Sequence, residues 1–85
     1  MIQELQNKLH NEIPLTKYMD IKIQDYNENE LVTTAPLSIN INDKGTAFGG
    51  SLSTMTIISA WSLCWLISKE LGFDSNNIVI IKNET

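Results

Sequence analysis

The sequence has no arginine, one cysteine, one histidine and two prolines among its 85 residues. The single cysteine excludes an internal disulfide and a cysteine-based zinc site, and the single histidine excludes a multi-histidine metal centre, so we expect neither a metal nor a cofactor. Ten acidic residues against six lysines give a net charge of −4, whereas a nucleic-acid-binding protein normally carries a basic surface. The N-terminus lacks the basic segment and apolar run of a signal peptide, and the expected compartment is the cytoplasm.

The first quarter of the chain changes its hydrophobic period. Ile2, Leu5 and Leu9 recur at helical spacing and predict a short amphipathic helix over residues 2–12, which ends before a proline. Apolar and polar residues then alternate over residues 19–24, and this pattern predicts a half-buried strand.

A second strand and a long loop follow. Asn27-Glu28-Asn29 has the composition of a turn, and Leu31–Ala35 is expected to return as the second strand of an antiparallel hairpin. Residues 37–48 are polar and turn-rich, and ordered loops of this length often carry function.

The next segment is the most apolar of the chain. No charged residue occurs from Gly45 to Ser68, and the apolar residues cover nearly every direction of a helical wheel. This pattern predicts a helix that opens at Gly49-Gly50, spans about 21 residues, stops before Gly72 and is buried on most sides. The β-branched run Ile78–Ile81 predicts a strand buried on both faces.

A hairpin and one further strand cannot cover such a helix. We therefore expect one α+β domain over residues 1–85 in which an antiparallel sheet wraps the helix, with the sheet incomplete in this chain and self-association covering what remains. The alternative is a small single-span membrane protein. It is less favoured, because the run Leu52–Ile67 has only 16 residues and contains five hydroxyl side chains.

The Gly49-Gly50 pair marks the candidate site. The first N–H groups of a helix have no acceptor within it and lie at the positive end of its dipole, so they suit a carbonyl oxygen that gains negative charge. Asn40 and Asn42, just upstream, are candidates to orient a water or a substrate amide. The structural alternative is that the glycines permit tight packing and the asparagines make turns.

Three further residues of the helix have competing interpretations. Trp61 and Trp65 lie four residues apart on one helix face, which favours core packing. The alternative is that Trp61 lines a tunnel for an acyl chain. Cys64, between apolar neighbours, is expected to be buried rather than nucleophilic.

Several motifs together resemble a known family. The sequence is similar to the thioesterase domain at the C-terminus of YiiD-type proteins, which has the hotdog fold. The resemblance is carried by segments spread over the chain: Ile13-Pro14-Leu15-Thr16, Ala35-Pro36-Leu37, Asn40-Ile41-Asn42-Asp43-Lys44-Gly45-Thr46, Phe48-Gly49-Gly50-Ser51-Leu52 and Ala60-Trp61.

This resemblance implies the front half of a hotdog domain, usually a homodimer, that acts on an acyl thioester of coenzyme A or a carrier protein. The candidate site residues are Asn42, Gly49 and Gly50 for catalysis, and Asn40, Phe48, Ser51 and Trp61 for substrate binding.

The chain also departs from the related phenylacetyl-type thioesterases. Phe48 replaces a histidine of their motif, and Ile57 stands where they carry a catalytic acid. The alternative function is therefore a catalytically inactive remnant, or a module for binding or dimerisation.

Overall fold

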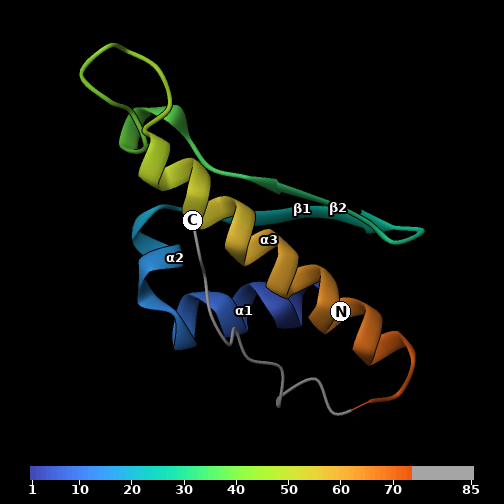
Figure 1. The fold of residues 1–85 in the computed structure, drawn as a ribbon. Coiled ribbons are helices and arrows are strands. Elements are labelled where there is room, and N and C mark those ends of the chain that lie inside the picture. Colours follow the sequence, from blue (N-terminus) through green and yellow to red (C-terminus); the bar gives the residue numbers. More distant parts are fainter. Residues whose placement is uncertain (74–85) are drawn as a thin grey trace.

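The computed structural model describes residues 1–73, so the predicted strand at Ile78–Ile81 lies outside the described residues. Figure 1 shows a β-hairpin and short helices beside one long helix that runs along most of the molecule. The elements in chain order are α1 (Ile2–Glu12), α2 (Pro14–Tyr18), β1 (Lys22–Asn27), β2 (Glu30–Thr34), the 3-10 helix η1 (Leu37–Ile39) and α3 (Gly49–Glu70).

The N-terminal helix is confirmed, whereas the first strand begins later than predicted. Pro14 occupies the first turn of the additional helix α2, where its missing N–H costs nothing. Thr16 is fully buried, and its hydroxyl donates to the Ile13 carbonyl at 2.8 Å. Asp20 then adopts a left-handed conformation (φ 55°), and this turn delays the strand until Lys22. The alternation over residues 19–24 reflects burial of Met19, not an extended backbone there.

The predicted antiparallel hairpin is confirmed. Strands β1 and β2 pair from Lys22–Thr34 to Asn27–Glu30, with a register shift between Ile23 and Asp25. Glu28 and Asn29 form the connection with φ values of 49° and 63°. Two successive residues at positive φ match the twist of the flanking strands, as in a type I′ hairpin turn.

The long helix α3 begins and ends at the glycine signals. It has 22 residues and no side-chain cap at its N-terminus. At its other end Gly72 takes φ 80°, with its N–H donating to Lys69 O at 3.2 Å and the Phe73 N–H donating to Ser68 O at 2.9 Å. These two hydrogen bonds form a Schellman motif, in which the left-handed residue is usually glycine.

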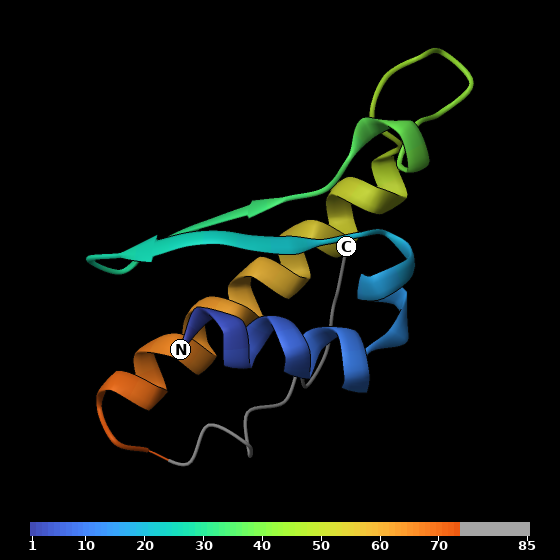
Figure 2. The same ribbon diagram turned by 180° about the vertical axis from the view of Figure 1, so that it is seen from behind.

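The core lies between α3 and the other elements. In Figure 2, which views the molecule from behind, α1 and the hairpin both lie in front of α3. Apolar side chains from α1, the α2–β1 connection, β1 and α3 meet there. The buried hydrophobic residues are Leu5, Leu9, Met19, Ile21, Ile23, Ile58, Trp65 and Leu66.

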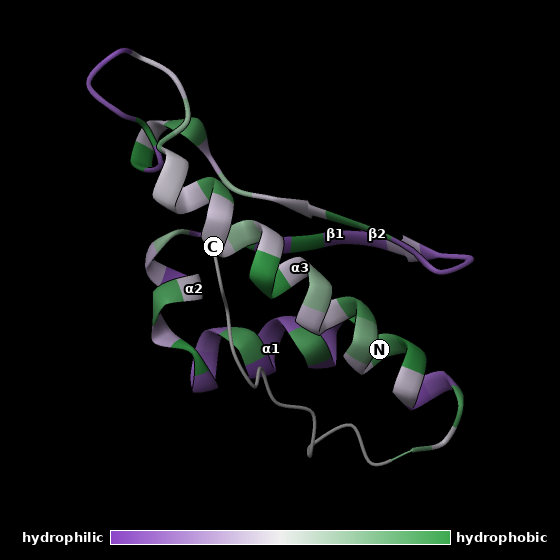
Figure 3. Cartoon of the chain, in the orientation of Figure 1, coloured by the Kyte–Doolittle hydropathy of each residue, from purple (hydrophilic) through white to green (hydrophobic). Residues whose placement is uncertain are grey.

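The opposite face of α3 is uncovered by the described residues, so the prediction that the helix is buried on most sides is wrong for this part of the chain. Only Ile58, Ser62, Trp65 and Leu66 of α3 are buried. Cys64, which the sequence predicts to be buried, is exposed. Figure 3 shows that hydrophobic residues recur along the whole of α3. The reason is geometric, since within residues 1–73 α1 and a two-stranded sheet cover one side of the helix.

The same helix has the length and apolar composition of a membrane span, and 22% of its most apolar 18-residue window is buried. A helix at the centre of a wrapping sheet needs the same composition, so this property does not separate the two structures.

An ion pair links the first turn of α1 to the last turn of α3. The Lys69 ammonium group lies 2.8 Å from a Glu4 carboxylate oxygen and 5.0 Å from the centre of the Trp65 ring, so α1 and the end of α3 are linked. The hydrogen bond from Lys69 holds the pKa of Glu4 below its ordinary value. A carboxylate with a lowered folded-state pKa stabilises the fold above its unfolded pKa, about 4.3, and loses this effect as the pH falls through the folded value.

Glu4→Gln is therefore expected to flatten the acid limb of the stability curve below about pH 4.3, with little change at neutral pH beyond loss of the ion pair. Urea denaturation at a series of pH values measures this. Glu12→Gln is the matched control, because Glu12 pairs with Lys8 inside α1 at 2.8 Å and joins no second element. Equal acid limbs for Glu4→Gln and the parent would contradict the expectation.

Candidate functional site

The N-terminus of α3 is an open set of hydrogen-bond donors. Along α3, the first N–H group with a backbone acceptor is that of Leu52, which donates to the Phe48 carbonyl at 3.1 Å. The N–H groups of Gly49, Gly50 and Ser51 precede it, and within residues 1–73 neither a side-chain cap nor a backbone carbonyl accepts from them. Such groups carry the positive end of the helix dipole and favour an oxygen with negative charge.

The loop before α3 is held by Asn42. Its Oδ1 accepts from the N–H groups of Lys44 at 2.8 Å and Thr46 at 3.0 Å. Its Nδ2 donates to Thr46 Oγ1 at 2.8 Å and to the Ala47 carbonyl at 3.3 Å. All of this side chain's hydrogen-bonding groups are thus engaged inside the loop, which projects beyond the start of α3 in Figure 1. Its role toward a substrate stays a prediction.

Asn40 has a different environment at the base of the same loop. It is 6% exposed, and its Nδ2 donates to the carbonyls of Met19 at 3.0 Å and Pro36 at 2.9 Å. Its main-chain carbonyl accepts from the Phe48 N–H at 2.7 Å. Asn40 therefore joins the end of α2, the end of β2 and the residue that precedes α3, and so it fixes where the helix begins.

Phe48 and Gly50 are packed against each other. A Cβ at Gly50 would lie 2.5 Å from Cε2 of the Phe48 ring, so the ring occupies the space that glycine leaves. A Cβ at Gly49, in contrast, would meet nothing within 4 Å. The two glycines thus differ, because Gly50 admits the aromatic ring beside the helix start whereas Gly49 tolerates a side chain.

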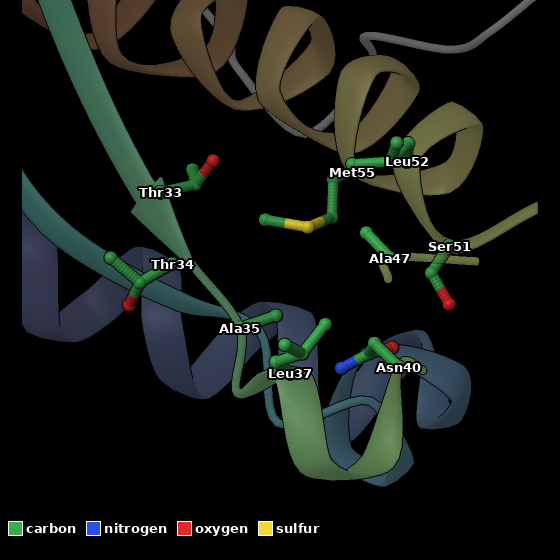
Figure 4. A pocket seen from close by; sticks show the side chains of 9 residues that line it. All are labelled: Thr33, Thr34, Ala35, Leu37, Asn40, Ala47, Ser51, Leu52 and Met55. Atoms are coloured by element: carbon green, nitrogen blue, oxygen red, sulfur yellow. The ribbon is translucent and has the colours of Figure 1, made fainter. Parts of the chain in front are cut away.

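Two cavities meet at the first turn of α3. One, of about 310 Å³, lies between β2, η1 and α3, and its lining is shown in Figure 4. The other, of about 430 Å³, lies between α2, η1 and the start of α3. Asn40 and Ser51 line both cavities, and Phe48 and Gly50 line the second. Four of the predicted site residues are therefore brought together where the free N–H groups of α3 lie.

Trp61 lies apart from this group. It is half-buried, packs against the core cluster, and lines neither cavity. The packing interpretation is thus the one that its position favours. The cavity walls include residues that sequence reasoning did not single out, among them Leu37, Leu52 and Met55 from one side and Tyr18 from the other. Leu37, Leu52 and Met55 become neighbours only through the approach of β2 to α3, which the sequence does not indicate.

Charge is scarce around the site. Asp43 and Lys44 pair with each other at 3.4 Å on the exposed loop. The described residues with a displaced pKa lie at the other end of α3. The hydrogen bond from Lys69 lowers the pKa of Glu4, and burial, together with Glu70, raises the pKa of Tyr26. No cluster of residues able to hold a metal ion occurs within residues 1–73. The site can therefore polarise a carbonyl through backbone donors, but the described part provides no acid or base beside it.

Two solved structures share this fold. A structure described as a "putative thioesterase" from Shewanella oneidensis is 33% identical, matches 86% of this chain and 54% of its own, and superposes with a TM-score of 0.83. A protein described as having unknown function, from Chlorobaculum tepidum, is 35% identical with a TM-score of 0.80, over 85% of this chain and 44% of its own. The fold is thus α+β of the hotdog type, and the chain spans about half the length of these solved relatives.

The family model described as "Putative thioesterase (yiiD_Cterm)" matches residues 2–85. The chain belongs to this YiiD C-terminal thioesterase family, as the motifs around Asn40–Thr46 and Phe48–Leu52 predict.

Proposed function

We propose that this chain binds an acyl thioester of coenzyme A or a carrier protein, with the thioester carbonyl oxygen at the N–H groups of Gly49, Gly50 and Ser51. The observation that carries the proposal is the uncapped start of α3, which opens where two cavities meet. A thioester carbonyl gains negative charge when it is attacked, and backbone donors aimed at that oxygen stabilise the charge. Membership of the thioesterase family supports the same substrate class.

In any form of the domain that turns the thioester over, the proposed reaction is hydrolysis. A water oxygen bonds to the carbonyl carbon, the carbon–sulfur bond breaks, and the thiol leaves with one of the water protons. This step is accelerated by a base that removes a proton from water. Ile57 on α3 provides none, and the only carboxylate of the loop, on Asp43, is paired with Lys44.

The apolar Ile57 and the pairing of Asp43 with Lys44 favour a second candidate function, a module that binds the thioester without turnover. The two functions share one binding site and differ only in the fate of the bound thioester. They are therefore separated by a measurement that follows binding and thiol release together.

The test combines amide NMR with a thiol-release assay on the purified 85-residue chain. Octanoyl-coenzyme A is expected to shift the amide signals of Gly49, Gly50 and Ser51, without releasing thiol faster than the uncatalysed reaction. Unchanged signals for these three residues at millimolar ligand would overturn the binding proposal. Thiol release above background would instead show that the chain contains a base that residues 1–73 do not place at the site.

Self-association is proposed for the uncovered face of α3. Cys64 on this face is exposed and Leu71 just after the helix is 66% exposed, and an apolar area of this kind on a small domain favours burial against a second copy. Sedimentation equilibrium at tens of micromolar is expected to give a mass above 9.6 kDa.

Cys64 provides an internal probe, because it is exposed on α3 and is the only cysteine. Mild oxidation is expected to yield a disulfide-linked dimer, which Cys64→Ser abolishes without changing the sedimentation mass. A 9.6 kDa monomer at this concentration would refute self-association.

A further inference from the structure

The cavity between β2 and α3 extends from the first turn of α3, which is called its open end below, to Thr33 on β2. Ser51, in the first turn of α3, lines the end at which the free N–H groups lie. Thr33 on β2 and Ser59 on α3 are hydrogen-bonded through their hydroxyl groups at 2.8 Å, and this contact joins strand and helix two turns further along. Ser59 lies eight positions after Ser51 on α3, which corresponds to about 12 Å along the helix axis.

The walls between these ends are neutral and mostly hydrocarbon. The strand side contributes Thr33, Thr34 and Ala35, η1 contributes Leu37, and the helix contributes Leu52 and Met55, in addition to Asn40, Ala47 and Ser51 at the open end. None of these nine side chains is charged. A buried carboxylate or ammonium group without a partner is strongly disfavoured, so this cavity suits an uncharged apolar group.

Met55 occupies a distinctive position among these residues. Figure 4 shows its thioether extending from α3 across the cavity toward β2, between the open end and Thr33. Methionine is unbranched and conformationally adaptable, so it can fill the space when it is empty and move aside for a ligand.

We propose that this cavity takes the acyl chain of the thioester, which runs along α3 from Ser51 toward the Thr33–Ser59 hydrogen bond, with Met55 as the residue that sets chain length. The inference rests on the proposed function, since the carbonyl at the helix start fixes where the chain enters. A volume of about 310 Å³ equals about ten water-sized groups of 30 Å³, and this corresponds to a linear chain of about eight to ten carbons. Acyl groups with a terminal carboxylate are excluded by the neutral walls.

The second cavity is then left for the thiol-bearing arm. It shares Asn40 and Ser51 with the first, and it contains the polar groups of Tyr18 and Thr54 beside the Phe48 ring. A thioester whose carbonyl lies at the helix start can place its acyl chain in one cavity and its thiol arm in the other, because Asn40 and Ser51 line both of them.

Methionine methyl NMR tests this placement directly, because the chain contains only three methionines. Met55 lines the proposed acyl cavity, Met19 lines the second cavity, and Met1 is 51% exposed and lines neither of them. The probes are non-hydrolysable ketone analogues of acyl-pantetheine, in which a methylene group replaces sulfur, with acetyl, butyryl, octanoyl and succinyl groups. Backbone amides of Gly49 to Ser51 are recorded in the same titration.

The octanoyl analogue is expected to shift the Met55 methyl signal strongly and the acetyl analogue weakly, while both shift Met19 and neither shifts Met1. The succinyl analogue is expected to bind more weakly than a butyryl analogue. Amide shifts at Gly49 to Ser51 without a Met55 shift would overturn this inference and leave the proposed function intact. A chain-length dependence at Met19 in place of Met55 would also overturn it. If neither the amides nor the methyl groups shift, both proposals fail.

A variant pair tests the role of Met55 in chain length. Each methylene that enters the cavity is worth about fourfold in affinity when fully buried, so octanoyl should bind on the order of a hundredfold tighter than butyryl. Met55→Phe, which fills the cavity with a stiff ring, is expected to reduce this ratio at least tenfold.

Leu63→Phe, on a half-buried position of α3 that lines neither cavity, is expected to leave the ratio unchanged. The ratio does not depend on the folded fraction of either variant. An unchanged ratio for Met55→Phe would refute the assigned role.

Discussion

Gly49→Pro is expected to weaken binding of an octanoyl-pantetheine ketone several-fold, and to lower turnover by about 10²–10³ in any form of the domain that hydrolyses the thioester. Proline removes one of the three free N–H groups at the start of α3. The loss is larger for turnover because the hydrogen bond to the carbonyl oxygen strengthens as negative charge develops.

The backbone at this position accepts proline without disrupting the helix. Gly49 is the first residue of α3, where proline is favoured, and Phe48 before it has φ −68° and ψ 131°, the extended geometry that a following proline requires. A side chain at Gly49 meets nothing within 4 Å. Gly49→Ala is therefore the matched control, because it adds a side chain and keeps the N–H.

Calorimetric titration of the parent and both variants measures the effect. Equal affinities for Gly49→Pro and Gly49→Ala would remove the Gly49 N–H from the site. Gly50 is less suitable for this comparison, because any side chain there displaces the Phe48 ring.

Trp65→Ala is expected to destabilise the fold by about 3–5 kcal/mol, enough to unfold most of the chain at 25 °C. Trp65 is 1% exposed and is the largest of the fully buried side chains. Its removal leaves a cavity between α1 and α3 and also removes the ring over which Lys69 lies. A chain of this size buries a smaller fraction of its surface than a larger domain does, so one such loss outweighs most of its net stability.

Trp61 is the internal control for this prediction. It lies one helical turn earlier and is half-buried, so Trp61→Ala is expected to cost clearly less than Trp65→Ala. Urea denaturation followed by circular dichroism measures both. Equal losses for the two variants would contradict the placement of Trp65 at the centre of the core.

Local signals in the sequence were sufficient for the helices that begin and end at strong markers. Residues 2–12 follow one helical period, and Gly49 and Gly72 delimit α3 through an open first turn and a left-handed C-terminal residue. The five-residue helix at Pro14–Tyr18 was missed because it is too short to show a period. Its only marker is the proline in its first turn.

Properties that depend on long-range approach were harder to predict. The sequence indicates that Asn40 and Asn42 belong to one functional loop, but not that Asn42 is engaged within that loop while Asn40 joins three elements. Met55 looks like any core residue of an apolar helix until β2 is seen to run beside it (Figure 4). Likewise, the exposure of Cys64 follows from how little of α3 the hairpin covers.

The central claim is that the thioester carbonyl accepts hydrogen bonds from the start of α3. Isotope-edited infrared spectroscopy of a bound acyl thioester labelled with ¹³C at the carbonyl tests it most directly, because hydrogen bonding lowers the carbonyl stretching frequency. The expected result is a lower frequency for the thioester bound to the parent and to Gly49→Ala than for the thioester in an apolar solvent, with part of this shift lost in Gly49→Pro. A bound carbonyl with the frequency of the apolar solvent, and unaffected by Gly49→Pro, would contradict the claim.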